Sequence, residues 1–228
     1  MTRVAIIAAM PGELSPFVHG WPTSTRNGIR FWAQRGKEEA WDEEWIAACA
    51  GAGQAAATRA FAAIEDGGPI SLAISVGWAG ALRADLAVGA AHNLAGVIDA
   101  RTGERFNCDA GCGNLWLTTS PRVADEAEKL RLASAYSASL VDMEAAAVAR
   151  LAAMREIPFY AIKGISDALH DRLPDFNPFI DSTGKFHTAR FAFHAALRPM
   201  YWPALVRMGE NSKRASQAIA EGLRSLLL

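Results

Sequence analysis

The chain has 228 residues, of which 51% are hydrophobic and 21% are charged, and its formal net charge is −1. A length of this order predicts one domain over residues 1–228, large enough to bury a substantial core. The near-neutral charge lacks the basic surplus that nucleic acid or an anionic membrane surface requires, so we expect neither partner.

Strands and helices alternate along the chain. Apolar or alternating runs predict strands at 3–10, 31–36, 44–51, 71–80 and 158–167, a strand end before Met143, and further sheet between 87 and 106. Helical signals predict helices at 52–66, 120–136 and 144–157, and a mostly helical tail over 188–228 interrupted by Pro199 and Pro203. Several strands are wholly apolar, which is typical of a sheet buried between helices, so we predict an α/β fold.

The sequence predicts neither a targeting segment nor a metal site. The longest apolar runs are broken by Gly, Asp or Arg, and the residues before the first strand lack the layout of a signal peptide. Three cysteines do not make a disulfide framework, and Cys108 and Cys112, with His92 upstream, do not supply four ligands at metal spacing. We therefore expect a cytoplasmic protein without a metal.

The ends of four predicted strands carry residues suited to chemistry. Ligands in α/β sheets bind outside the carboxyl ends of the strands. The residues found there are Glu13, Trp78, Asp142, Met143, Glu144, Ser166 and Asp167. Because three of the four strand ends carry a carboxylate, we expect these side chains to meet in one pocket.

Two acids flank Met143 directly before the Ala-rich helix in VDMEAAAVA. An acid at a helix start commonly caps free backbone N–H groups, and this is the simpler interpretation of both acids. The convergence of strand ends adds a second interpretation for Glu144, a contact with a ligand. Asp142 points the other way in the alternation of the strand, and we expect it to be structural.

The stretch GAGQAA (51–56) fits G-x-G-x-x-A between a strand and a helix, the position of a dinucleotide-binding fingerprint. That fingerprint also requires an acid at the end of the next strand to bind the cofactor ribose. The next strand ends SVGWAG, without an acid. A tight strand-to-helix turn explains the glycines, and we expect no cofactor.

Five stretches in the same order resemble those of bacterial methylthioadenosine/S-adenosylhomocysteine nucleosidases: VAIIAAMPGEL, GAGQAAA, SVGWAGAL, VDMEAAAVA and IKGISDAL. Together they span residues 4–169, and the ordered set is specific to the nucleoside phosphorylase/nucleosidase superfamily. The resemblance implies a three-layer α/β/α sandwich with a central mixed, twisted sheet. It also implies a homodimer that cleaves a purine nucleoside, with adenine as the expected base.

The same resemblance implies the catalytic roles. Asp167 would deliver a proton to N7 of the leaving purine, and Glu13 would orient the attacking water. Glu144 would accept hydrogen bonds from the ribose hydroxyls, and Lys163 stands where these nucleosidases have an arginine near the water. Bond cleavage builds positive charge on the sugar and negative charge on the base, and such charges call for these carboxylates and this acid.

Further substrate contacts follow from the resemblance: Ser166 before the acid, Met143 against the sugar and Val123 beside the base. The sequence departs from the nucleosidases at Trp78, where they carry a small hydroxyl residue, and at Arg122, where they carry a base-stacking phenylalanine. These departures leave the 5′ substituent and the exact base open. The stretch around them is closer to a divergent branch that includes the hopanoid-associated phosphorylases.

Water and phosphate are both possible nucleophiles. Superfamily phosphorylases usually carry GDPxR near the N-terminus, whereas this chain has AMPGEL, whose Glu13 repels phosphate, so we favour hydrolysis. Lys163 keeps phosphorolysis open, because an ammonium can hold phosphate. A non-catalytic nucleoside-binding protein is a third hypothesis, which the joint presence of Glu13, Glu144 and Asp167 disfavours. The aromatic-rich segment 176–187 is either a lid or an ordinary connecting loop.

Overall fold

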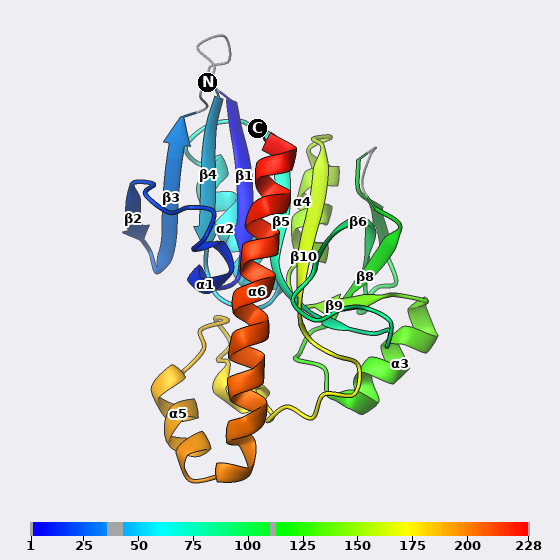
Figure 1. Ribbon diagram of the computed structural model, residues 1–228. Helices are drawn as coiled ribbons and strands as arrows, with labels where there is room; N and C mark the ends of the chain where they lie inside the picture. The colour runs from blue at the N-terminus through cyan, green and yellow to red at the C-terminus, as the bar shows by residue number, and fades with distance from the viewer. Residues whose placement is uncertain (1, 36–42, 110–112, 228) are drawn as a thin grey trace.

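The computed structural model describes residues 2–35, 43–109 and 113–227 (Figure 1). Cys112 lies outside these ranges, as do the last residues of the predicted strand 31–36 and of the predicted tail. Within the described ranges, no helix combines the length and the hydropathy needed to cross a membrane.

One mixed sheet of ten strands runs through the described part of the chain. Its strands are β1 (Thr2–Ala8), β2 (Thr23–Arg26), β3 (Ile29–Arg35), β4 (Glu43–Cys49), β5 (Ile70–Ala81), β6 (Ala91–Asp99), β7 (Arg105–Asn107), β8 (Leu115–Thr119), β9 (Leu140–Asp142) and β10 (Phe159–Asp167). Their order is β10-β6-β8-β9-β5-β1-β4-β3-β2, and β7 pairs with β6. β4, β1, β5 and β10 are mutually parallel, so their carboxyl ends meet at one edge.

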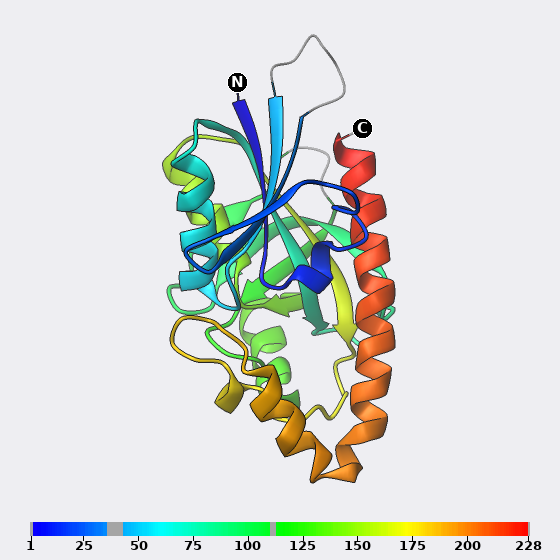
Figure 2. The same cartoon turned by 90° about the vertical axis from the view of Figure 1, so that its left-hand side faces the viewer.

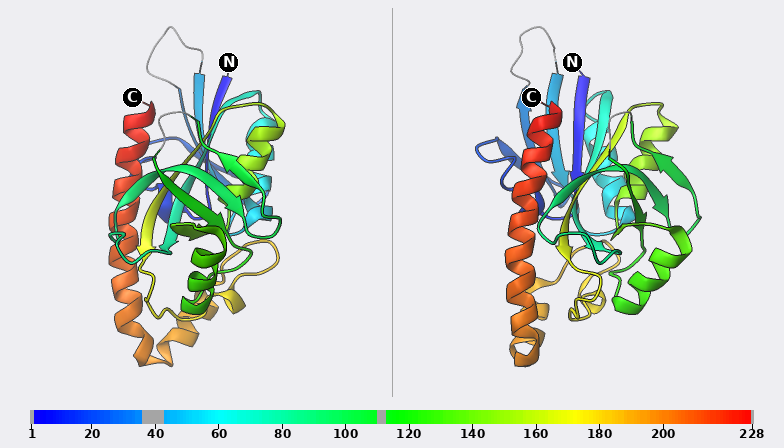
Figure 3. Two further views of the ribbon diagram at one scale, coloured as in Figure 1. Left: turned by 90° about the vertical axis from the view of Figure 1, so that its right-hand side faces the viewer. Right: turned by 45° about the vertical axis from the view of Figure 1, so that its right-hand side comes forward.

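Half of this sheet curls back on itself. β10 pairs with β5 as well as with β6, so β5, β10, β6, β8 and β9 close into a ring (Figure 3). The antiparallel pairings of β10 with β6 and of β5 with β9 allow this closure. The ring brings the end of β9 beside the ends of β5 and β10, although many residues separate these strands in the sequence.

Helices cover both faces of the sheet. They are α1 (Pro11–Leu14), α2 (Gln54–Glu65), α3 (Glu126–Tyr136), α4 (Ala145–Met154), α5 (Thr188–Ala196) and α6 (Trp202–Leu227), with short 3-10 turns η1 (Asn177–Phe179) and η2 (Pro199–Tyr201). α2 and α4 pack together on one face, and α1 and α6 pack on the other (Figure 2). The predicted three-layer α/β/α architecture with a mixed sheet is confirmed.

The alternation of β1 shows why the sheet is buried on both sides. Ala5 and Ile7 point into the core beneath α2 and α4, whereas Val4, Ile6 and Ala8 point into the core beneath α6. Successive side chains of a strand face opposite sides, so a strand between two helical layers must be apolar at every position. This is the origin of the continuous apolar run near the N-terminus.

α6 is a long helix that only partly rests on the sheet. Its 26 residues span about 39 Å, and its buried residues, from Ser212 to Leu223, form one stripe that begins near the middle of the helix. Gly164 of β10 allows close packing, since a Cβ there would lie 2.8 Å from the Cβ of Ala215. The first half of α6 extends past the strands together with α5 (Figure 3).

Some predicted element boundaries are wrong. The helix predicted over 120–136 begins at Glu126, because Asp125 caps it by accepting a hydrogen bond from the Glu128 backbone N–H at 2.8 Å. Pro203 does not interrupt the tail; it lies in the first turn of α6, where a missing N–H costs nothing. β8 was not among the predicted strands.

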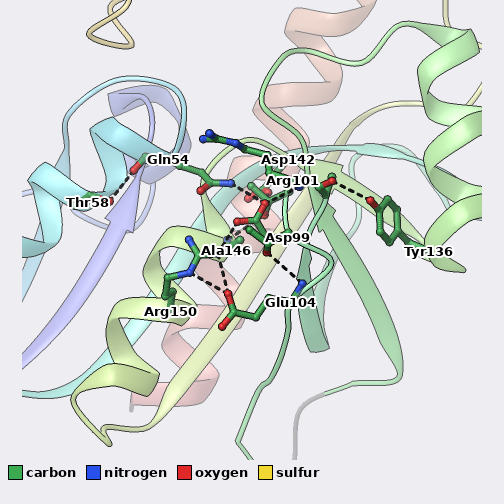
Figure 4. A network of polar contacts seen from close by, with 12 residues as sticks. Gln54, Thr58, Asp99, Arg101, Glu104, Tyr136, Asp142, Ala146 and Arg150 are labelled. Atoms are coloured by element: carbon green, nitrogen blue, oxygen red, sulfur yellow. Dashed lines mark hydrogen bonds and ion pairs between the residues drawn. The ribbon is translucent and has the colours of Figure 1, made fainter.

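A buried acid ties β6 to both helices of the first layer (Figure 4). Asp99, 1% exposed, accepts hydrogen bonds from Arg150 Nη2 of α4 at 2.6 Å, from the Arg101 backbone N–H at 2.9 Å and from Gln54 Nε2 of α2 at 3.3 Å. Burial raises the pKa of Asp99, but these hydrogen bonds outweigh burial and bring it below its ordinary value. The contact holds α2 and α4 against the sheet edge that carries the pocket.

Candidate functional site

A cavity of about 290 Å³ lies at the carboxyl ends of β1, β5, β9 and β10. Seven of the eight site residues named from the sequence line it: Glu13, Trp78, Val123, Met143, Glu144, Ser166 and Asp167. The closed half of the sheet produces this convergence, because it places β9 and β10 on either side of β5.

Six apolar side chains form another part of the cavity wall. Leu173, Phe176, Ile180, Phe186 and Phe191 come from the segment that follows β10, and Met208 comes from α6. The rings of Phe176 and Phe191 lie 5.0 Å apart, so this wall is packed rather than loose. Segment 176–187 thus forms one side of the pocket, as expected of a lid.

Glu13 is a buried carboxylate that joins two strand ends. Its Oε2 accepts hydrogen bonds from the backbone N–H groups of Ala9 and Met10, both at 2.8 Å, and its Oε1 accepts one from Trp78 at 2.8 Å. Burial raises its pKa, although the three hydrogen bonds oppose this. Oε1 accepts one bond in the structure and keeps a lone pair that a water can use. Gly77 is required beside it, since a Cβ there would lie 2.8 Å from Oε1.

Asp142 is the acid that caps α4. Its Oδ2 accepts a hydrogen bond from the Ala145 backbone N–H at 2.9 Å, and its Oδ1 accepts one from the Thr119 hydroxyl at 2.7 Å. Oδ2 also lies 2.9 Å from Lys163 Nζ. The structural role expected of Asp142 agrees with these contacts.

Lys163 lies deeper than the other predicted site residues. Its side chain is fully buried in β10 and is not among the residues that line the cavity. An ammonium inside a protein needs a carboxylate partner, and Lys163 is committed to Asp142. Burial lowers its pKa, but Asp142, Glu144 and Glu13 outweigh burial and raise it, so Lys163 stays charged. It influences the pocket through its charge rather than by contact.

Glu144 faces the cavity and leaves the capping of α4 to Asp142. Its Oε1 accepts a hydrogen bond from the Gly53 backbone N–H at 2.6 Å, and its Oε2 accepts one from Met143 at 3.2 Å. Burial and the nearby Asp142 charge raise its pKa to about 8, against the opposing effect of Lys163. Burial therefore favours the protonated form of Glu144.

The glycine stretch GAGQAA has a different use from dinucleotide binding. Gly53 donates its N–H to Glu144, and Ala52 donates its own to the Gly184 carbonyl at 2.8 Å. A Cβ at Gly51 would lie 2.5 Å from the same carbonyl oxygen, and Gly51 has a φ of +107°. The turn thus connects Glu144 to the segment that walls the pocket.

Asp167 is engaged at both oxygens. Its Oδ1 accepts a hydrogen bond from the Ser166 hydroxyl at 2.6 Å, and its Oδ2 accepts one from Lys129 Nζ. Lys129 is 2% exposed, lines the cavity and also donates to the Ala168 carbonyl at 2.6 Å. The sequence analysis missed Lys129, although its spacing from Leu132, three residues on, places it on the buried face of α3.

Trp78 is anchored away from the cavity at its polar end. Its indole Nε1 donates to the Ser216 hydroxyl at 2.9 Å and to the Ser212 carbonyl at 3.1 Å, both on α6. A Cβ at Gly12 would lie 3.2 Å from the indole ring, so Gly12 leaves room for it. The ring is a fixed wall between α1, α6 and the cavity.

Val123 is held by a residue that the sequence analysis did not single out. The Asn177 carboxamide accepts from the Val123 N–H at 2.9 Å and donates to the Val123 carbonyl at 3.1 Å. This pair joins the lid segment to the strand-to-helix loop that carries Arg122, which is exposed at the cavity. No group of three His, Cys, Asp or Glu in the described ranges is arranged to hold a metal ion.

Glu144→Gln should alter the pH dependence of stability. A group whose folded pKa is raised contributes stability that is fully present below its unfolded pKa and is lost as pH rises through the folded pKa. Between about pH 4 and pH 8 the unmodified protein should therefore lose stability relative to the variant, by at most about 1.4 kcal/mol per pH unit. Urea unfolding across this range measures the difference. Glu221→Gln, on the exposed side of α6, is the control, and a pH-independent difference for Glu144→Gln would contradict the assignment.

Lys129 and Asp167 should behave as a coupled pair. Lys129→Met leaves a buried carboxylate without its partner and should cost about 3–5 kcal/mol of unfolding free energy, and Asp167→Asn should be costly for the converse reason. The double variant should recover much of the loss, and the coupling is read from a double-mutant cycle in urea. The exposed Lys213→Met is the matched control. Additive losses would show that the two side chains do not support each other.

Comparison with known proteins relates part of the chain to one protein family. A family model described as the phosphorylase superfamily matches residues 100–197, a span that contains Val123, Lys129, Glu144 and Asp167. Comparison with curated proteins finds no match.

Solved structures share the fold over nearly the whole chain. The 5′-methylthioadenosine/S-adenosylhomocysteine nucleosidase of Helicobacter pylori matches with a TM-score of 0.72 and 16% identity, over 99% of this chain and 97% of that one. The futalosine hydrolase of Helicobacter pylori strain 26695 matches with a TM-score of 0.71 and 17% identity, over the same shares. The S-adenosylhomocysteine nucleosidase of Streptococcus pyogenes matches with a TM-score of 0.69 and 20% identity, over 100% and 98%.

These findings confirm the resemblance predicted from the sequence: the chain has the fold of these nucleosidases and matches the phosphorylase superfamily over residues 100–197, which supports an N-glycosyl hydrolase or nucleoside phosphorylase.

Proposed function

We propose that the protein hydrolyses the N-glycosidic bond of a purine nucleoside. The observation that carries this proposal is the meeting of three buried carboxyl groups, Glu13, Glu144 and Asp167, around one cavity at the carboxyl edge of the sheet. A nucleoside has a sugar that becomes positive and a base that becomes negative as the bond breaks. Acidic groups around the sugar and a proton source at the base suit that change in charge.

The sugar would lie against Met143, with its hydroxyls at Glu144. As a carboxylic acid Glu144 donates to one hydroxyl and accepts from another, and as a carboxylate it accepts from both. The Gly53 N–H fixes the position of Oε1. Positive charge on the sugar favours the carboxylate form, so Glu144 would interact more strongly with the transition state than with the bound nucleoside.

The base would lie on the side of Asp167 and Val123. Asp167 would deliver the proton that makes the purine a neutral leaving group. Ser166 and Lys129 hold its two oxygens in place. On this proposal Lys129 positions Asp167, and the proton that the base gains is balanced by the one that the attacking water loses.

Glu13 would hold the attacking water at its free lone pair on Oε1. Phosphorolysis, the second candidate, needs cations at that position. The cations that line the described cavity are Lys129, which is bound to Asp167, and Arg122, which is exposed. Lys163 is paired with Asp142 and does not line the cavity. It is therefore a weaker candidate for a phosphate ligand than the sequence indicates.

The residues that line the cavity indicate which nucleoside it would accept. The lid and α6 offer Leu173, Phe176, Phe186, Phe191 and Met208, a surface that suits an apolar 5′ substituent better than a charged one. Adenine is the base that we propose first, and the fold shared with a futalosine hydrolase makes other purines the necessary comparison. By the same resemblance we propose a cytoplasmic homodimer. A non-catalytic nucleoside-binding protein is disfavoured because binding alone does not need three buried carboxyl groups.

Release of free purine should occur without inorganic phosphate. A panel of adenine and 6-oxopurine nucleosides, with polar and apolar 5′ groups, is assayed for free base with and without phosphate. We expect free ribose as the second product and no gain in rate from phosphate. Strict dependence on phosphate, with ribose 1-phosphate as product, would assign the protein to the phosphorylases, and no release with tight nucleoside binding would favour the non-catalytic hypothesis.

Asp167→Asn should lower kcat by about 10²–10⁴-fold, because the amide can hydrogen-bond to the base but cannot donate a proton in the same way. Nucleoside affinity should fall only modestly. Glu144→Gln should weaken binding as well as turnover, since ribose contacts are present before the transition state. Circular dichroism must confirm that each variant is folded at the assay temperature. Near-normal turnover by folded Asp167→Asn would show that Asp167 is not the acid.

A further inference from the structure

The end of the molecule formed by α5, η2 and the first turns of α6 exposes large apolar side chains; we call this end the apolar tip. Phe193 is 70% exposed, Leu197 65%, Met200 78%, Trp202 53% and Val206 62%. Of the seven large hydrophobic side chains that are exposed in the described ranges, these are five. Single exposed apolar residues are ordinary, but a cluster within 14 successive positions (193–206) indicates an interaction surface.

The apolar tip is held rigidly by the side that faces inward. On α5, Phe191 packs against the lid through Phe179, with ring centroids 5.3 Å apart. The Trp202 indole N–H donates to the Ala195 carbonyl at 3.0 Å, so the polar group of this residue is satisfied while its side chain stays exposed. The outward side chains therefore belong to an ordered helical surface.

The segment that forms the apolar tip carries an excess of positive charge. Residues 182–209, between Asp181 and Glu210, contain Lys185, Arg190, Arg198 and Arg207 and no Asp or Glu, although the whole chain has a net charge of −1. The four cationic side chains are exposed. The expectation of no membrane partner rests on the net charge of the whole chain, which does not reveal the excess of positive charge in this segment.

We propose that the apolar tip docks the protein onto an anionic lipid surface. Apolar and aromatic side chains can enter the boundary between headgroups and acyl chains, while arginines beside them contact lipid phosphates. A second copy of the chain is a poorer occupant, because a two-fold interface at the apolar tip would bring Arg198 and Arg207 of one copy towards the same arginines of the other. Nucleic acid would match the charge but not the apolar side chains.

The position of the apolar tip relates docking to the pocket. The tip projects from the end of the molecule at which the carboxyl ends of the parallel strands lie (Figures 1 and 2). Phe191 of α5 and Met208 of α6 line the cavity, so the elements that would touch lipid also wall the pocket. Docking thus places the pocket next to the membrane surface, whatever reaction takes place in it.

Vesicle flotation tests the proposal without any assay of activity. The full chain is mixed with vesicles of phosphatidylcholine alone or of phosphatidylcholine with phosphatidylglycerol. We expect flotation with the anionic vesicles only, decreasing as salt is raised. Arg198→Glu and Arg207→Glu should each lower the partition coefficient about five-fold or more, and Leu197→Ser and Met200→Ser about ten-fold each.

Matched controls lie elsewhere on the surface. Met154→Ser, at a methionine that is 72% exposed on α4, and Arg101→Glu, at an exposed arginine between β6 and β7, should float like the unmodified protein. Circular dichroism checks the fold of each variant. Absence of flotation, equal flotation with both vesicles or equal losses in the controls would overturn the proposal. It would also be overturned if Leu197→Ser and Met200→Ser dissociated a dimer in sedimentation without changing flotation.

Discussion

The pairing of Lys163 with Asp142 is the interaction on which the pocket depends. A lysine in the interior of β10 requires a buried carboxylate, and Asp142, at the end of β9, supplies it while capping α4 and binding Thr119. These contacts tie the end of β9 to β10, the strand on the other side of β5, and set the direction in which α4 leaves the sheet. The position of Glu144, the residue before α4, follows from this geometry.

The same pair separates the roles of the acids at the carboxyl edge. Asp142 has a partner at each oxygen, and its contacts serve the structure. Glu144 has only backbone partners and faces the cavity. Glu13 is intermediate: three backbone N–H groups hold its carboxyl group, but one lone pair on Oε1 remains for a further hydrogen bond. Burial raises the pKa of Glu144 and of Glu13. The surroundings of each acid, and not the residue type alone, therefore decide how readily it binds a proton.

Enclosure of the cavity is a second constraint, and small residues meet it. The glycines of GAGQAA allow the lid to approach the turn before α2, and Gly164 allows α6 to rest on β10. A helix held in this way from Ser212 onwards can project its first turns beyond the sheet, where it forms a pocket wall on one side and the apolar tip on the other. The pocket wall and the apolar tip thus share the same elements.

The sequence by itself determined the α/β class, most elements and seven of the residues around the cavity, because apolar periodicity and strand-end position are local properties of the chain. Only the tertiary structure decided the partners of the charged groups. The contact of Lys129 depends on α3 lying beside Asp167, and the ion pair of Lys163 depends on β9 and β10 lying on either side of β5. Both contacts join residues more than 20 positions apart, and the closure of the sheet into a ring, which no local pattern encodes, brings them together.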